Sequence, residues 1–107
     1  MYREVNKEAD ALATAAITSG QSQHEVTDCR KAGVRRVKVA FDGGRRDSLA
    51  SCGWVVQAGV EGMDHDIQWQ RVASSNSLLG DVTSVHAELA GACEAILWTL
   101  KWLQSNS

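Results

Sequence analysis

Proline is absent from this chain of 107 residues, which also lacks a long apolar run and an excess of basic residues. A bilayer span needs about 20 consecutive apolar residues, and the charged start at residues 1–8 does not have the form of a signal peptide. The formal net charge of -2 excludes the broadly basic surface of a general nucleic-acid binder. We therefore expect an intracellular protein, cytoplasmic or nuclear, whose contacts with nucleic acid are local.

Cysteine is scarce as well. Cys29, Cys52 and Cys93 are an odd number, and no two of them have the C-x-x-C spacing that holds zinc or forms a redox pair. We expect three free thiols in a reducing compartment. With 44% hydrophobic residues, the chain is long enough for one compact domain and too short for two.

Hydrophobic periodicity predicts a helix at each end of the chain. Residues 5–17 are rich in alanine and have apolar or small side chains at helical spacing, with Asn6 as the expected cap. Residues 84–103 form a longer helix, with Trp98 and Trp102 as a second apolar edge. We expect its main buried face to consist of Val85, Leu89, Cys93, Ile96, Leu100 and Leu103.

Three strands are expected between these helices. Residues 35–41 alternate between apolar and polar side chains and end at the turn signal Asp42-Gly43-Gly44, and residues 51–58 and 66–73 form the other two strands. Their short connections predict an antiparallel meander. Residues 18–33 have no periodicity and are expected to be a linker. The predicted fold is α/β, a three-stranded antiparallel sheet with one helix on each face.

Three acidic residues could carry chemistry, and each also has a structural explanation. Asp42 ends a strand where glycines let a phosphate approach the backbone, although an aspartate before glycine is also an ordinary turn residue, the favoured explanation of this motif alone. Glu88 lies one turn into the long helix beside the face that packs on the sheet, and Asp10 lies early in the first helix. The helix dipole favours acids at both positions, so the residues alone leave the two explanations open for Glu88 and favour the structural one for Asp10.

Taken together, these segments resemble the ribonuclease H superfamily, in particular the domain found in reverse transcriptases of retroelements. Residues 39–44 resemble the family's first strand with its first catalytic Asp, and residues 53–56 resemble its second strand. Residues 83–89 resemble the start of the helix that carries the catalytic Glu. Residues 2–13, with the string Arg-Glu-x-Asn-x-x-Ala-Asp-x-Leu-Ala, resemble the family's last helix and place its fourth catalytic Asp on Asp10.

The resemblance divides the chain into a last helix at residues 1–17, a linker at 18–34 and an N-terminal half at 35–107, in permuted order. No residue matches the family's third catalytic Asp, which follows the long helix in the family. The chain therefore corresponds either to a partial circular permutant or to a piece cut across two tandem units. The resemblance implies a nuclease that cuts the RNA strand of an RNA/DNA hybrid, impaired in this chain alone. The alternative is a non-catalytic remnant that binds nucleic acid or associates with itself.

The resemblance also implies a metal cofactor, Mg²⁺ or Mn²⁺. In such sites two divalent cations about 4 Å apart hold the attacking water and the leaving 3′ oxygen, and carboxylates suit them as ligands. The implied catalytic residues and metal ligands are Asp42, Glu88 and Asp10. The expected nucleic-acid contacts are Gly43, Gly44, Arg45, Arg46, Thr83 and Ser84.

Two further expectations concern partners. The strand at residues 35–41 would be central in the family, so here one of its edges is expected to be uncovered and to favour a homodimer, through that strand or through exchange of the first helix. Basic residues near this strand could meet phosphates or simply make an edge strand soluble.

Of the four tryptophans, which could stack on bases, we expect Trp54 and Trp98 in the core. His86 is expected to be a surface residue despite its place beside Glu88.

Overall fold

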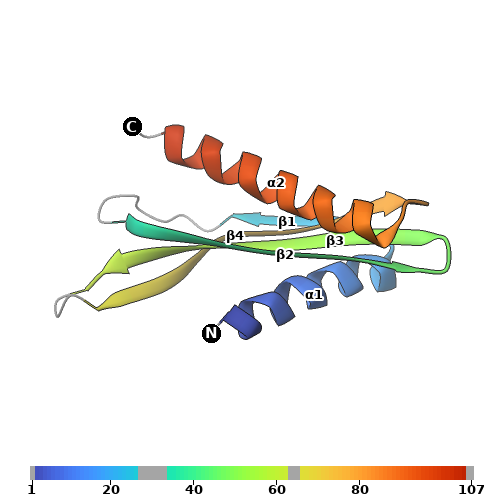
Figure 1. Cartoon of the computed structure of the whole chain (residues 1–107), viewed down its shortest axis with the longest axis horizontal. Coiled ribbons are helices and arrows are strands. Elements are labelled where there is room, and N and C mark those ends of the chain that lie inside the picture. Colours follow the sequence, from blue (N-terminus) through green and yellow to red (C-terminus); the bar gives the residue numbers. More distant parts are fainter. Residues whose placement is uncertain (1, 27–33, 63–65, 106–107) are drawn as a thin grey trace.

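In a computed structural model of the chain, a four-stranded antiparallel sheet lies between two helices (Figure 1). The structure describes residues 2–26, 34–62 and 66–105, and only the backbone of residues 2–6 and 35. Helix α1 packs on one face of the sheet and helix α2 on the other, which confirms the α/β class and the placement of the helices. The elements are α1 (Tyr2–Ser19), β1 (Gln23–Val26), β2 (Val34–Arg46), β3 (Leu49–Glu61), β4 (Ile67–Gly80) and α2 (Ser84–Gln104).

The number of strands differs from the sequence prediction. The sheet has the order β1-β4-β3-β2, because the segment predicted to be a linker contains the strand β1, which pairs with β4 from Gln23↔Asn76 to Val26↔Ala73. All four residues of β1 are exposed, so the segment has no apolar alternation that could have revealed it. Residues 27–33 of the predicted linker, which include Cys29, lie outside the described residues.

Strand β2 also continues further than predicted. It passes through the expected turn at Asp42-Gly43-Gly44, and these residues pair with Gly53, Cys52 and Ser51 of β3. The chain reverses instead after Arg46, where Asp47 has a φ of 57°. Aspartate is one of the few residues that tolerate this left-handed conformation, so the prediction of a turn at Asp42 was wrong.

Helix α1 packs through small side chains. Ala9, Ala13 and Ala16 are buried at helical spacing against the sheet, as expected from the sequence. The helix begins at Tyr2, so Asn6 lies inside it and is not its cap. Two polar side chains of the sheet donate hydrogen bonds to backbone carbonyls of α1. Ser51 Oγ donates to Ala13 O at 2.5 Å, and Asn76 Nδ2 donates to Leu12 O at 2.8 Å.

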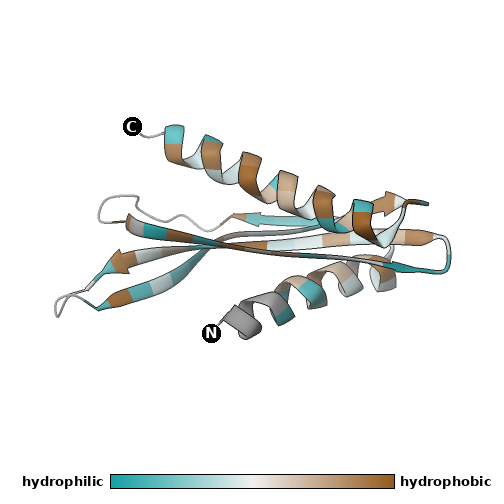
Figure 2. Cartoon of the chain, viewed as in Figure 1, coloured by the Kyte–Doolittle hydropathy of each residue, from teal (hydrophilic) through white to brown (hydrophobic). Residues whose placement is uncertain are grey.

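Helix α2 lies on the sheet by a different face from the one predicted. Its buried residues are Ala87, Gly91, Ala95 and Thr99, which recur every fourth position. The large apolar residues expected to be buried are 42–62% exposed, as is Leu97, and Figure 2 shows hydrophobic residues recurring along this helix. The exposed set is Val85, Leu89, Ile96, Leu97, Leu100 and Leu103.

The core is thin and lies on both faces of the central strands. On the α1 side Ala9, Ala40 and Val55 pack together. On the α2 side Trp54, Val56, Ala73 and Ala95 form the cluster, joined by Val37, Val39 and Trp98, which confirms the expected core positions of Trp54 and Trp98. No described helix combines the length and the apolar character that crossing a membrane requires.

Candidate functional site

Asp42 lies on β2 opposite Gly53 of β3. Side chains alternate between the two faces of a strand, so Asp42 shares its face with Ala40, two residues earlier, which packs against Ala9 of α1. Its carboxylate accepts a hydrogen bond from its neighbour, Gly43 N–H, at 2.9 Å. The side chain therefore points toward the helix that carries Asp10.

Gly53 allows α1 to come close to this point. A Cβ added at Gly53 would overlap the backbone of Ala9 and lie 2.7 Å from Ala13 N and 2.9 Å from Leu12 Cβ. Because the strand has no side chain here, the backbone of α1 lies directly against β3, beside Asp42. The Asp42 carboxyl lies near enough to that of Asp10 for the two to interact, which raises the pKa of Asp42, although the two residues belong to elements far apart in the sequence.

Gly43 allows α2 to lie close to β2 on the opposite face of the sheet. An added Cβ at Gly43 would overlap the backbone of Ala87 and Glu88, so the first turn of α2 lies against β2 next to Asp42. The carboxylate of Glu88 acts on Asp42 through its charge. Of the acids singled out in the sequence, Asp10 and Glu88 both lie near enough to Asp42 to raise its pKa, from α1 on one face of the sheet and from α2 on the other.

The electrostatics of the cluster follow from this crowding. Burial, the hydrogen bond with Asp10, and the negative charges of Asp10 and Glu88 raise the pKa of the Asp42 carboxyl above its ordinary value, against the opposing effect of the Gly43 N–H. The negative charge gathered around Asp42 therefore favours a positive charge beside it. A divalent cation could supply that charge.

The donor set fits a weakly held magnesium ion. Within residues 2–26, 34–62 and 66–105, no group of three or more His, Cys, Asp or Glu side chains is arranged to hold a metal ion. Magnesium keeps several waters and is commonly bound by one or two carboxylates together with substrate phosphates. The pair Asp42 and Asp10, with Glu88 nearby, meets that requirement for one cation.

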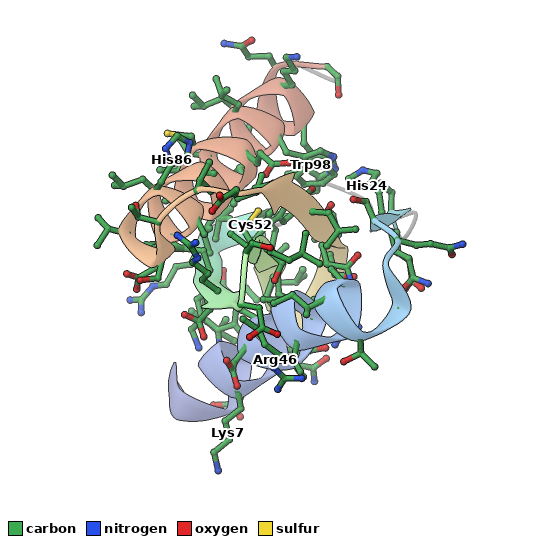
Figure 3. All side chains as sticks on the ribbon, turned by 90° about the vertical axis from the view of Figure 1, so that its right-hand side faces the viewer. Lys7, His24, Arg46, Cys52, His86 and Trp98 are labelled. Carbon is green, nitrogen blue, oxygen red and sulfur yellow. The ribbon has the colours of Figure 1, made fainter. Side chains whose placement is uncertain are left out.

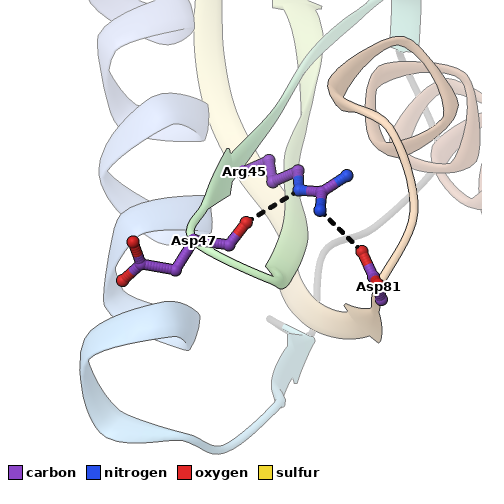
Figure 4. Close-up of polar contacts among 3 residues, drawn as sticks. All are labelled: Arg45, Asp47 and Asp81. Atoms are coloured by element: carbon purple, nitrogen blue, oxygen red, sulfur yellow. Dashed lines mark hydrogen bonds and ion pairs between the residues drawn. The ribbon is translucent and has the colours of Figure 1, made fainter.

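The residues expected to contact nucleic acid have mixed environments. Gly43 is covered by α2, whereas an added Cβ at Gly44 would meet nothing within 4 Å. Arg45 is already engaged, since its Nη2 lies 2.7 Å from Asp81 Oδ1 and its Nε donates to Asp47 O at 2.8 Å (Figure 4). Arg46 is exposed at the end of β2, so of the two arginines it is the one better placed to meet a phosphate.

Thr83 and Ser84 begin α2. Thr83 is the N-cap, and its side chain accepts a hydrogen bond from His86 N at 3.1 Å. Ser84 is the first helical residue and is exposed, as is His86, which agrees with the surface position expected for that histidine. Thr83 therefore has a structural task at this end of the helix.

One acid near the site escaped the sequence analysis. Glu94 lies on the sheet side of α2 and accepts hydrogen bonds from Cys52 Sγ at 3.1 Å and Ser77 Oγ at 3.2 Å. Burial and this carboxylate raise the pKa of the Cys52 thiol to about 12, and Cys52 lies between the helix and the sheet in Figure 3. Cys52 and Cys93 are both free, as expected. The polar run at residues 74–77, inside a buried strand, was the available signal.

Comparisons of this chain with protein-family models, with curated proteins and with solved structures found no match.

Proposed function

We propose that this chain is part of a ribonuclease H-like nuclease that cleaves the RNA strand of RNA/DNA hybrids with Mg²⁺ or Mn²⁺, and that it is slow by itself. The single observation behind the proposal is that Asp10 on α1 and Glu88 on α2 both lie near enough to Asp42 on β2 to raise its pKa. The sequence motifs that resemble the family name these same residues. A chance arrangement of surface acids would keep them apart, because like charges repel.

In this proposal the chain's residues hold the cation and the substrate. A bound divalent cation would polarise the scissile phosphodiester and supply an activated water. Asp42 and Asp10 would hold it, and Glu88 would add charge from the other face of the sheet. Arg46 would meet the phosphates. The family's third Asp has no counterpart here, so one ligand is lacking and the expected rate is low.

The alternative is a non-catalytic remnant that binds nucleic acid or associates with itself. The observation that favours it is the pairing of Arg45 with Asp81, which removes one of the few basic groups near the site. The absence of a three-ligand metal group among the described residues points the same way. The first proposal predicts cleavage that depends on the carboxylate of Asp42, and the alternative predicts binding without cleavage.

Metal-dependent cleavage of a labelled RNA/DNA hybrid by the full chain separates them. We expect slow cleavage that requires Mg²⁺ or Mn²⁺ and falls at least about 100-fold in Asp42→Asn, the scale on which losing a group that stabilises the transition state acts. Asp47→Asn is the matched control, since Asp47 is exposed on the same hairpin and should retain the wild-type rate. Binding of the hybrid without cleavage in all three proteins would favour the remnant. Cleavage as fast as that of an intact enzyme would contradict the expected impairment.

A further inference from the structure

Strand β2 is an open edge of the sheet. Within the described part of the chain it pairs with β3 alone, at the end of the order β1-β4-β3-β2. It is 13 residues long, and Phe41 on it is 37% exposed. Long edge strands with free backbone donors and acceptors readily pair with another strand, and proteins seldom leave them uncovered.

The exposed apolar residues of α2 border this same edge. Glu94, Leu97, Trp98 and Lys101 lie on the flank of α2 nearer to β1, where they line a hollow together with His24, and Trp98 and His24 lie on the same side in Figure 3. At 3.6 residues per turn, the opposite flank points toward β2. That flank carries Val85, Leu89, Ile96 and Leu103, which are 62%, 61%, 51% and 42% exposed.

We propose that a second copy of this chain covers both features at once. Two β2 strands pair antiparallel around a two-fold axis perpendicular to the sheet, and two four-stranded sheets become one of eight strands. Such an axis keeps like faces on the same side, so the two α2 helices lie next to each other. The contact is isologous and closes as a dimer.

The spacing of the elements suits this arrangement. Helix α2 packs over β2 and β3, so its axis lies about one strand spacing, roughly 5 Å, from the two-fold axis. The two helices then lie about 10 Å apart, within the usual range for packed helices. Val39 and Ala95 belong to the same cluster, so a two-fold axis at Val39 places Ile96 near Ile96 of the second copy.

Charge favours the same register. With Val39 opposite itself, Arg36 lies opposite Asp42 of the second copy, and both side chains are on the α1 face of the sheet. Arginine pairs well with a carboxylate in this position. Lys38, the next basic residue along the strand, already has a contact in its own copy, because its Nζ lies 3.8 Å from the centre of the Trp69 ring. The register therefore pairs one basic residue of each strand with the strand's one acid.

The contact is smaller than a standard protein–protein interface. Standard interfaces use about 20 to 30 residues on each side, whereas β2 and one flank of α2 offer roughly half that number. Their large apolar side chains supply the buried surface, and strand pairing satisfies the open edge. We expect a dimer that dissociates in the range of tens of micromolar.

Sedimentation equilibrium of the full chain between about 1 and 200 µM tests the helix contact. Two adjacent substitutions give matched variants, since Ile96 and Leu97 are 51% and 58% exposed but lie on opposite flanks. We expect Ile96→Glu to weaken the dimer at least tenfold and Leu97→Glu to leave it unchanged, with unaltered circular dichroism in both. A chain that is only monomeric at 200 µM, or two variants that weaken the dimer equally, would overturn the proposal.

Charge exchange tests the strand register. Arg36→Glu should weaken the dimer at least tenfold, because two acids then face each other across each pair. Adding Asp42→Arg to the same chain restores opposite charges and should recover most of the affinity. A dimer insensitive to Arg36→Glu, or a double variant no better than the single one, would overturn the register. Both readouts are association constants, so they are independent of any nuclease activity.

Discussion

The two faces of α2 are built from different residues for different reasons. The face toward the sheet is made of small side chains, Ala87, Gly91 and Ala95 with Thr99, and all of them are buried. The other face carries the large apolar residues and is exposed. The difference teaches that close approach of a helix backbone to a sheet, and not the size of the apolar residues, decides which face is buried here.

The close approach is visible in the glycines. A Cβ added at Gly91 would lie 3.2 Å from Cys52 Cβ and 3.4 Å from Asp42 O, and one at Gly43 would overlap the backbone of α2. Larger residues on either side would push the helix away from β2. The same contact holds Glu88 near Asp42, so packing and the candidate site depend on one feature.

The largest effect is expected where that contact is tightest. Gly43→Ala should lower the free energy of unfolding by about 3 kcal/mol or more, because its Cβ can be accommodated only by moving α2. Gly44→Ala, one residue along the same strand with open space around it, should change it by less than about 1 kcal/mol. Urea denaturation measures both. Equal losses in the two variants would show that α2 does not lie against Gly43.

A second pair of substitutions compares the two faces of the helix directly. Ala95→Leu adds volume to a fully buried site and should cost about 1–2 kcal/mol. Leu100→Ala removes apolar volume from a side chain that is 50% exposed and should cost less than about 1 kcal/mol in the monomer. Thermal denaturation below 1 µM, where copies are apart, gives the comparison. The reverse order would mean that the predicted large apolar face is the buried one after all.

The smallest expected effect concerns the carboxyl of Asp42, whose pKa is raised in part by the charge of Glu88 on α2. The folded-state pKa of Asp42 is raised, so the stability that its proton supplies is complete below the unfolded pKa and is lost as pH rises through the folded pKa. Asp42→Asn keeps the side chain neutral and should be more stable than the wild type at pH 7, by less than about 1 kcal/mol because solvent screens this partly exposed group.

The advantage should shrink toward pH 4, where the wild-type carboxyl also gains its proton. Urea denaturation at both pH values without divalent cations measures the difference. A variant that is less stable than the wild type at pH 7 would contradict the crowding of Asp10, Asp42 and Glu88.

The sequence predicted the elements better than their contacts. Alternation found β2, and helical spacing found both helices and the buried alanines of α1. It assigned the wrong face of α2, because hydrophobic periodicity follows side-chain size and carries no information on how closely two backbones approach. It missed β1, whose exposed residues pair through the backbone. It also placed a turn at Asp42, because Asp-Gly-Gly is a common turn sequence. The sequence does not show that Gly43 instead lets α2 lie against the strand, whereas Gly44 has open space around it.

The candidate site was predictable only through motifs. The positions of Asp10 and Glu88 in their helices did not distinguish them from ordinary acids near a helix start. Only the resemblance to the family assigned them to one site with Asp42. Their convergence depends on Gly53 and Gly43, which the sequence analysis assigned to a strand and a phosphate contact. Ser51 and Asn76, which hold α1 in place, gave no signal beyond being polar within an apolar segment.

The measurement that tests the account most directly is paramagnetic broadening of backbone amide signals by Mn²⁺. We predict that low concentrations of Mn²⁺ broaden the amides of Asp10, Gly43 and Glu88 together, that Mg²⁺ reverses the broadening, and that Asp42→Asn abolishes it. Broadening centred on the exposed Asp47 hairpin, or broadening that persists in Asp42→Asn, would contradict the claim that these three acids form one cation site.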